Sequence, residues 1–296
     1  MNQIYEFSKT HVNELYFKDF NKKYDSWINN VSEVVEKNVL NKLLLKMNFI
    51  SKNKYKEFLK NYLLHYMVET DNYKNFVIIP MISKNRKKNS SYEVMGYISE
   101  IDKELEMMED IELFPDEDTL SYDIAFIEKD DLETIIIVDD ICGTGGTLNK
   151  FIKEHKSFMQ GKKIIILFCV VTVVALEKIR DIVSENDDLN IRVDFFILEE
   201  KISDSKYLND EEYKTLIKIE SSLWKRKNNN ILGYKKSELL VGFSHNMPNN
   251  TLSSFWYSDE QGKMKGWNTL FKRFTKKGRL NRKEENYDNA KKRKVK

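Results

Sequence analysis

Residues 134–148 read Thr-Ile-Ile-Ile-Val-Asp-Asp-Ile-Cys-Gly-Thr-Gly-Gly-Thr-Leu, and this stretch decides how the rest of the chain is interpreted. Its first part, 135–138, is a run of four β-branched residues without helical spacing. Such a run is typical of a strand that is buried on both faces of a parallel sheet. Two carboxylates, Asp139 and Asp140, follow at the expected carboxyl end of this strand, which is where open α/β sheets bind their ligands.

The glycine-rich segment after the two acids predicts a phosphate-binding turn. Glycines at 143, 145 and 146 can adopt positive φ and expose backbone amides, and Thr144 and Thr147 add hydroxyls before a helix expected near Leu148. Amides and a helix N-terminus attract an anion, whereas the acids favour hydroxyl groups or a divalent cation. A sugar phosphate satisfies both requirements. The alternative is a turn that only connects strand and helix, although such a turn does not need two adjacent acids.

Two other phosphate-binding motifs do not fit this segment. A Walker motif ends in Gly-Lys-Ser/Thr, but Gly146 is followed directly by Thr147 and the lysine is absent. In a dinucleotide-binding Rossmann motif the acid follows the glycines by about twenty residues, whereas here the acids precede them. A nucleoside triphosphate or a dinucleotide is therefore a poorer match than a sugar phosphate.

The segment from Val138 to Thr147 resembles the phosphoribosyl pyrophosphate (PRPP) signature of type I phosphoribosyltransferases: a hydrophobic strand, two acids, two variable residues and Thr-Gly-Gly-Thr. The resemblance implies a parallel-sheet, Rossmann-like α/β core. It also implies that Asp139 and Asp140 hold the ribose hydroxyls as catalytic and metal-binding acids, with Mg²⁺ as the cofactor. The residues that it assigns to the 5-phosphate are Cys142, Gly143, Thr144, Gly145, Gly146 and Thr147.

A basic loop follows residues 76–80, which we expect to form the first strand of the core. The resemblance implies that this loop binds pyrophosphate. Its basic and hydroxyl side chains can neutralise and hydrogen-bond a polyanion, with help from the dipole of a helix expected from Tyr92. The loop lacks the short acid-Lys-Gly sequence of the metabolic enzymes, and the alternative is an exposed basic turn. The candidate residues are Ser83, Lys84, Arg86, Lys88, Ser90 and Ser91.

Alternating strand and helix patterns predict right-handed crossovers and a parallel sheet. The expected strands cover 122–127, 135–138, 164–174, 191–198 and 238–243, with helices at 148–159 and 175–186. We therefore divide the chain into a helical N-terminal extension, an α/β core, a hood-like C-terminal segment that packs on the core, and a basic tail. Their predicted ranges are 1–72, 73–245, 246–275 and 276–296.

The C-terminal segment combines hydrogen-bonding side chains with clustered aromatic residues. This composition suits an acceptor-binding surface, in which an aromatic ring stacks on a base and amides contact its edge. The alternative is an Asn-rich loop whose tryptophans fill the core. The segment also resembles the end of phosphoribosyltransferase-like proteins of bacterial conflict systems, including antiphage retrons. The candidate acceptor residues are His245, Asn246, Asn250 and Trp256.

Charge and composition give further expectations about partners and location. Residues 272–296 contain twelve Lys or Arg and three acidic residues, so the tail is either a solvated end or a contact for nucleic acid or an acidic partner. The N-terminal helices can cover the sheet, form a homo-oligomer interface or bind a protein partner. Two cysteines, the absence of a signal peptide and the absence of an apolar run of 18 residues indicate a cytoplasmic protein without membrane segments.

Three functional hypotheses remain open from the sequence. The first is a phosphoribosyltransferase that uses PRPP and Mg²⁺, with a base, a nucleotide or a macromolecule as acceptor, as an antiphage toxin effector. The second is a non-catalytic module that senses PRPP or a nucleotide on the same fold, because fold alone does not separate binding from catalysis. The third is a nucleic-acid-binding protein that depends on its basic tail.

Overall fold

The computed structural model describes residues 2–70, 76–82, 90–105, 112–113, 132–224, 228–258 and 264–274. The chain forms two compact units, Ile50–Lys206 and the combination of Met1–Phe49 with Tyr207–Lys296. The boundaries thus lie at 49/50 and 206/207, whereas the sequence placed them at 72/73 and 245/246. The predicted strand at 122–127 and the basic tail at 276–296 lie outside the described residues.

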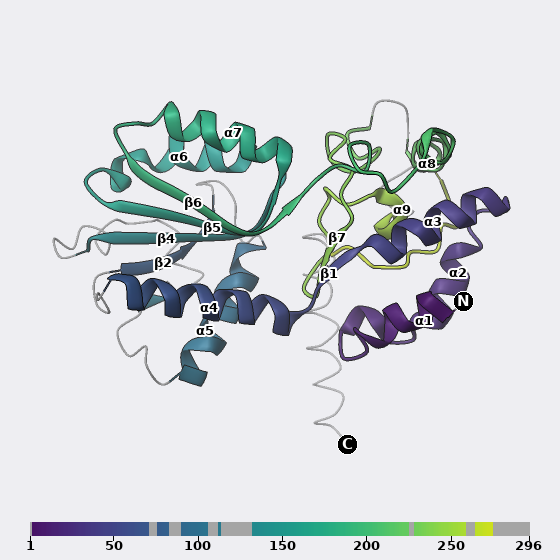
Figure 1. The fold of residues 1–296 in the computed structure, drawn as a ribbon, viewed down its shortest axis with the longest axis horizontal. Coiled ribbons are helices and arrows are strands. Elements are labelled where there is room, and N and C mark those ends of the chain that lie inside the picture. The colour runs from purple at the N-terminus through teal and green to yellow at the C-terminus, as the bar shows by residue number, and fades with distance from the viewer. Residues whose placement is uncertain are drawn as a thin grey trace, which may run out of the picture. The chain divides into compact units, whose positions relative to one another are not determined.

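The unit of residues 50–206 contains a five-stranded sheet in the order β3-β2-β4-β5-β6 (Figure 1). All neighbouring strands pair in parallel, which confirms the parallel α/β fold. The central strands consist of Val, Ile and Leu with few polar residues, as expected for strands covered on both faces. The strands are β2 (Phe76–Pro80), β3 (Glu112–Leu113), β4 (Thr134–Cys142), β5 (Lys163–Thr172) and β6 (Asn190–Glu199).

Helices cover both faces of this sheet. In Figure 1, α6 (Gly146–Met159) and α7 (Val173–Ser184) lie over one face, and α4 (Lys52–Thr70) and α5 (Ser91–Leu105) lie over the other. The face under α6 and α7 has an apolar core in which isoleucines of β4 and β5 pack against Phe151 and Ile179 of the helices. Because α4 packs on the sheet, residues that were predicted to belong to a separate helical extension are part of the α/β unit.

The strand order places a topological switch point between β2 and β4. From β2 the chain continues into α5 on one face, and from β4 it continues into α6 on the other face. Adjacent parallel strands whose connections leave in opposite directions define a topological switch point, and open α/β sheets bind ligands outside the strand ends at that point. The residues after β2 and after β4 are therefore the ones expected to contact a ligand.

The second unit joins both ends of the chain. Its two-stranded sheet pairs β1 with β7, and the amide of Asn48 donates to the carbonyl of Leu240 at 2.7 Å. The prediction that 238–243 belong to the core sheet is wrong, since these residues pair with a strand in a segment expected to be helical. The elements are α1 (Asn2–Lys9), η1 (Leu15–Phe17), α2 (Phe20–Ile28), α3 (Val34–Lys46), β1 (Asn48–Ile50), α8 (Asp210–Leu223), β7 (Val241–Phe243) and α9 (Ser253–Trp256).

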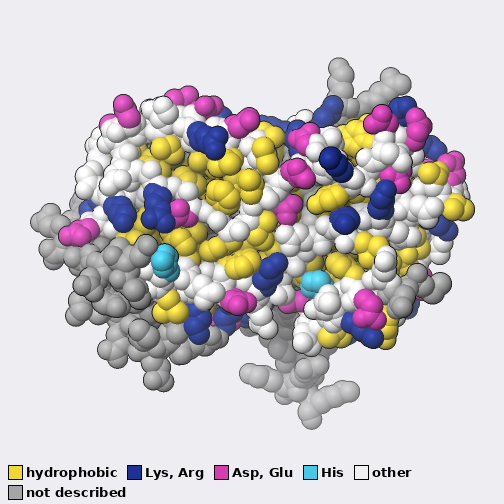
Figure 2. Space-filling view, in the orientation of Figure 1, with side chains coloured by type: hydrophobic (Ala, Val, Ile, Leu, Met, Phe, Trp, Pro, Cys, Tyr) yellow, Lys and Arg dark blue, Asp and Glu magenta, His cyan; other side chains and the backbone are white. Residues whose placement is uncertain are grey.

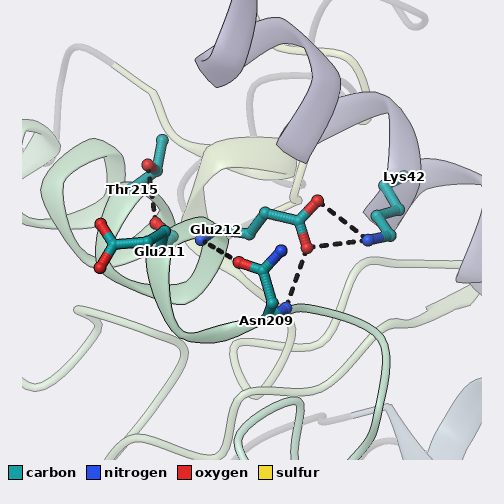
Figure 3. A network of polar contacts seen from close by, with 5 residues as sticks. All are labelled: Lys42, Asn209, Glu211, Glu212 and Thr215. Atoms are coloured by element: carbon teal, nitrogen blue, oxygen red, sulfur yellow. Dashed lines mark hydrogen bonds and ion pairs between the residues drawn. The ribbon is translucent and has the colours of Figure 1, made fainter.

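Specific polar contacts hold the N-terminal helices to the C-terminal segment within this unit. The indole Nε1 of Trp27 donates to the carbonyl of Ser254 at 2.8 Å. The start of α8 carries a capping box, in which Asn209 accepts a bond from the amide of Glu212 at 3.0 Å and its own amide donates to the Glu212 carboxylate at 2.9 Å (Figure 3). Lys42 of α3 donates to the same carboxylate, so one glutamate caps α8 and joins it to α3.

Within the described part of the chain, no helix has the length and hydropathy that crossing a membrane requires.

Candidate active site

The two acids lie at the end of β4, and their side chains are almost fully buried. Asp139 is 6% exposed and Asp140 is 5% exposed. An oxygen of the Asp139 carboxylate accepts a hydrogen bond from the amide of Asp140 at 3.0 Å. Buried carboxylates are rare unless they are paired or hydrogen-bonded, so their presence next to the predicted switch point is consistent with a ligand-binding role.

The two acids contact different segments of the α/β unit. The Asp140 carboxylate accepts a hydrogen bond at 2.9 Å from the Oγ of Ser90, which directly precedes α5. Asp139 instead lies near Cys142, just before the turn: burial raises the pKa of the Cys142 thiol, and the charge of Asp139 adds to this effect. The pair therefore joins the segment after β2 to the segment after β4.

A tyrosine of α4 forms a hydrogen bond with the backbone of the acidic pair. The hydroxyl of Tyr55 donates to the backbone carbonyl of Asp139 at 3.3 Å. Burial raises the pKa of Tyr55 well above its usual value, and the nearby Cys169, Asp140 and Asp139 add to this effect. The hydroxyl consequently keeps its proton at neutral pH and remains a donor. Sequence analysis did not identify Tyr55, because a tyrosine on an amphipathic helix looks like any other core residue.

Of the three glycines for which the sequence allowed positive φ, only Gly145 adopts it in the turn after β4. Gly145 has φ of +70°, and it packs so closely against α7 that a Cβ at this position would lie 2.9 Å from the Cγ of Lys178. Its carbonyl accepts a bond from the amide of Asn149 at 2.9 Å, so α6 begins immediately after the turn. A residue with a side chain fits neither the backbone conformation nor the available space.

The groups of the turn divide into internal and outward-facing ones. Cys142 is buried, and burial raises the pKa of its thiol to about 12 even though the amide of Gly145 donates to the sulfur. These two residues therefore stabilise the turn from inside. Gly146 and Thr147 are exposed, and Thr144 is half-buried. Of the six residues predicted for the 5-phosphate, these three are placed where an anion can reach them at the N-terminus of α6.

A threonine from the neighbouring strand also contacts the turn. Thr172, the last residue of β5, donates through Oγ1 to the carbonyl of Gly143 at 2.9 Å and accepts from the amide of Ala175 at 2.9 Å. Sequence analysis did not identify Thr172, which lies inside the strand expected at 164–174. A single buried hydroxyl at the carboxyl end of an apolar strand is the signal that identifies it.

The predicted pyrophosphate residues are only partly described by the structure. Ser83, Lys84, Arg86 and Lys88 lie outside the described residues. Ser91 is fully buried and donates to the carbonyl of Met81 at 3.2 Å, so its hydroxyl joins the start of α5 to the residue that follows β2. Ser90 is the described member that reaches the acids. The pyrophosphate role of this segment stays a prediction.

The predicted acceptor residues belong to the other unit, where each has a structural contact. The Asn246 side chain bonds to both the amide and the carbonyl of Phe274, at 2.8 and 3.2 Å. Trp256 is 1% exposed, donates to the carbonyl of Thr251 at 2.8 Å and lies beneath the guanidinium of Arg273. A base could stack on this indole only after that packing opened.

The remaining two acceptor candidates have comparable environments. Asn250 is buried, and its backbone carbonyl accepts from the hydroxyl of Ser237 at 2.8 Å. The imidazole of His245 stacks on the ring of Phe243 with centroids 5.1 Å apart. All four belong to the unit that combines the two ends of the chain, whereas the acidic pair belongs to the unit of residues 50–206, and their acceptor role stays a prediction.

The acids fit a magnesium ion that is shared with a phosphorylated ligand. No group of three or more His, Cys, Asp or Glu that could hold a metal occurs among the described residues. Magnesium, however, is commonly bound by one or two carboxylates together with substrate phosphates and water, and does not require a complete protein cage. Two adjacent carboxylates beside a turn that the sequence predicts to bind phosphate match that donor set.

The comparisons with known proteins agree with this geometry. No curated protein matches the chain in a sequence search. The PRTase-CE family model matches residues 24–273, which includes most of both units. The chain therefore belongs to the PRTase-CE family and is a phosphoribosyltransferase-like protein with a Rossmann-like core.

Proposed function

We propose that the chain binds PRPP with Mg²⁺ and transfers the phosphoribosyl group to an acceptor, with release of pyrophosphate. The observation that supports this most strongly is the position of Asp139 and Asp140. They are buried at the end of β4, beside the switch point, and are followed by a turn with a positive-φ glycine at the N-terminus of α6. A ligand with hydroxyls and a phosphate a few ångströms apart matches this arrangement.

Each part of the site has one task in this proposal. The carboxylates of Asp139 and Asp140 accept hydrogen bonds from the ribose hydroxyls and hold the metal. The 5-phosphate lies against Thr144, Gly146 and Thr147, where amides, hydroxyls and the dipole of α6 stabilise its charge. Bound magnesium would neutralise the charge that develops on the leaving pyrophosphate. The basic residues of the segment after β2 would share that charge.

The binding step is tested by calorimetry on the wild type and the Asp139→Asn/Asp140→Asn variant, with PRPP and MgCl₂ as the titrant. Each lost charge-assisted hydrogen bond weakens binding by about 1.5–3 kcal/mol, so we expect the affinity to fall at least about tenfold. Asn is nearly isosteric with Asp, so the loss reports charge and not packing. A Lys150→Met variant on α6, which changes an exposed side chain paired with Glu154, serves as the control.

Equal affinity of wild type and double variant would contradict the proposed ribose contact. Catalysis is tested by following pyrophosphate release from PRPP in a cell extract and identifying the molecule that gains the sugar phosphate. An antiphage effector that acts in this way would lower cellular PRPP when the wild type is expressed, but not when the double variant is expressed. Tight PRPP binding without pyrophosphate release under any of these conditions would favour the alternative, a non-catalytic PRPP sensor.

A further inference from the structure

We infer that Thr172 is a positioning residue of the phosphate turn, although it lies outside the glycine-threonine motif and on a different strand. The inference rests on the proposed function, because it assigns Thr172 a role in binding the 5-phosphate at that site. Thr172 is 3% exposed, and its hydroxyl makes one bond in each direction. It donates to the carbonyl of Gly143 and accepts from the amide of Ala175, each at 2.9 Å.

The direction of the Gly143 carbonyl determines where the next amide points. A peptide group is planar and trans, so its C=O and N–H bonds point in opposite directions. Because the Gly143 carbonyl points to Thr172, the amide of Thr144 points away from β5. That amide has no hydrogen-bond partner within the described part of the chain. The Thr172 hydroxyl thus keeps an amide of the turn directed away from β5, and this amide is available to an anion.

A second contact, made by α7, holds the other end of the turn. The side chain of Lys178 in α7 lies against Gly145, and the side chain of Ile182, also in α7, is the next nearest to Gly145. The hydroxyl of Thr172 also caps α7, because it accepts from the amide of Ala175. One residue therefore sets the start of α7 and the orientation of Gly143, and the two contacts together fix both ends of the Gly143–Gly145 segment.

A purely structural role would give a different experimental result. Loss of an N-cap destabilises a helix wherever it lies, and it does not by itself change the affinity for a phosphate. Asn209 offers a matched comparison, since it caps α8 in the other unit by accepting from the amide of Glu212 at 3.0 Å (Figure 3). A positioning role requires that the cap on α7 affects phosphate binding and the cap on α8 does not.

The experiment measures the affinity of the full chain for ribose 5-phosphate by calorimetry in four variants. Thr172→Val removes both hydrogen bonds, and we expect the affinity to fall roughly three- to tenfold, as for loss of one or two hydrogen bonds. Thr172→Ser retains both bonds and should bind like the wild type. Thr172→Asp accepts the Ala175 amide as a helix cap but has no proton to donate to Gly143, so it should lose affinity while α7 stays capped. Asn209→Ala should bind normally despite lower stability.

These variants separate the inference from the proposed function. A wild type that does not bind ribose 5-phosphate would overturn the proposed function and the inference with it. Unchanged affinity in Thr172→Val or in Thr172→Asp, with a wild type that binds, would overturn the inference alone. An equal loss in Asn209→Ala would also overturn it, because the effect would then come from general destabilisation. If Thr172→Val fails to fold, Thr172→Ala, which also removes both hydrogen bonds and adds no charge near the phosphate, replaces it in the comparison with Thr172→Ser.

Discussion

At the scale of single residues, two glycines at the ends of α6 have the same backbone strain and different surroundings. Gly145 has φ of +70° and its absent Cβ would lie 2.9 Å from Lys178, whereas Gly161 has φ of +73° and no atom within 4 Å of that position. Alanine at Gly161 should therefore cost only the left-handed conformation, about 1–2 kcal/mol. Alanine at Gly145 adds a steric clash, and we expect a total of about 2–4 kcal/mol.

Urea unfolding followed by far-UV circular dichroism measures this difference. We also expect Gly145→Ala to weaken ribose 5-phosphate binding, because the turn must shift away from Lys178 to make space for the methyl group. Gly161→Ala should bind the ligand like the wild type. If the two variants lose equal stability and retain equal affinity, the close packing of the turn against α7 is not important for the site.

The residues that sequence analysis identified are those whose chemistry is unusual for their local context. Two adjacent acids after an apolar strand, and glycines before a helix, conflict with ordinary core composition, and so they were recognisable. Tyr55 and Thr172 were missed because their importance depends on partners far away in the chain, at Asp139 and Gly143. The sequence contains no signal for such pairings beyond one hydroxyl in an apolar run.

At the scale of elements, α8 contains a buried carboxylate that accepts hydrogen bonds through both oxygens. Glu220 is fully buried; one oxygen accepts from the amide of Ser254 at 2.7 Å and the other from Leu232 and Ser253 at 3.2 and 3.1 Å. Glutamine has only one acceptor oxygen, so its NH₂ group would face at least one of these donors. We expect Glu220→Gln to lower the free energy of unfolding by about 1–3 kcal/mol.

The change is measured by urea unfolding followed by tryptophan fluorescence. Glu211→Gln on the same helix is the control, because that side chain is exposed and, within the part of the chain that the structure describes, forms an ion pair with Lys214 at 2.7 Å. Exposed pairs of this kind contribute little, and the control should change stability by less than about 1 kcal/mol. A Glu220→Gln variant as stable as the control would show that the three amides are satisfied in another way.

The elements of the parallel sheet could be predicted because their patterns are local. Apolar β-branched runs and the helices between them indicated β2, β5 and β6 within two residues of their observed bounds, whereas β4 extends four residues beyond its predicted end and includes the two acids. The partner of β7 could not be predicted in this way, since β1 is three residues long and about 190 residues away in the sequence. The division of the chain depended on that pairing, which is why the predicted boundaries differ from the observed ones.

At the scale of the whole molecule, the distribution of charged side chains bears on the nucleic-acid hypothesis. On the face shown in Figure 2, Lys and Arg side chains lie among Asp and Glu side chains with apolar groups between them. A mixed surface of this kind does not favour nucleic acid, which binds to continuous basic areas. The nucleic-acid hypothesis assigned this contact to the basic tail at 276–296, which lies outside the described residues, and it stays a prediction.

The distribution of tryptophan makes it possible to observe the two units separately. All four tryptophans, at positions 27, 224, 256 and 267, belong to the unit that combines the two ends of the chain. Most of the parallel strands belong to the other unit, so circular dichroism reports on both units and fluorescence reports on one. Chains with several domains often unfold in more than one step, and two signals are then needed to follow them.

We predict that ribose 5-phosphate stabilises the unit of residues 50–206 and leaves the fluorescence transition unchanged. At a free concentration of 100 times Kd, a ligand that binds only the folded state adds about 2.7 kcal/mol to the free energy of unfolding. The urea midpoint by circular dichroism should rise accordingly, whereas the midpoint by tryptophan fluorescence should stay the same, because Asp139, Asp140 and the phosphate turn all lie in the unit without tryptophan. Equal shifts of both midpoints would contradict this prediction and would mean that the two units unfold as one cooperative structure.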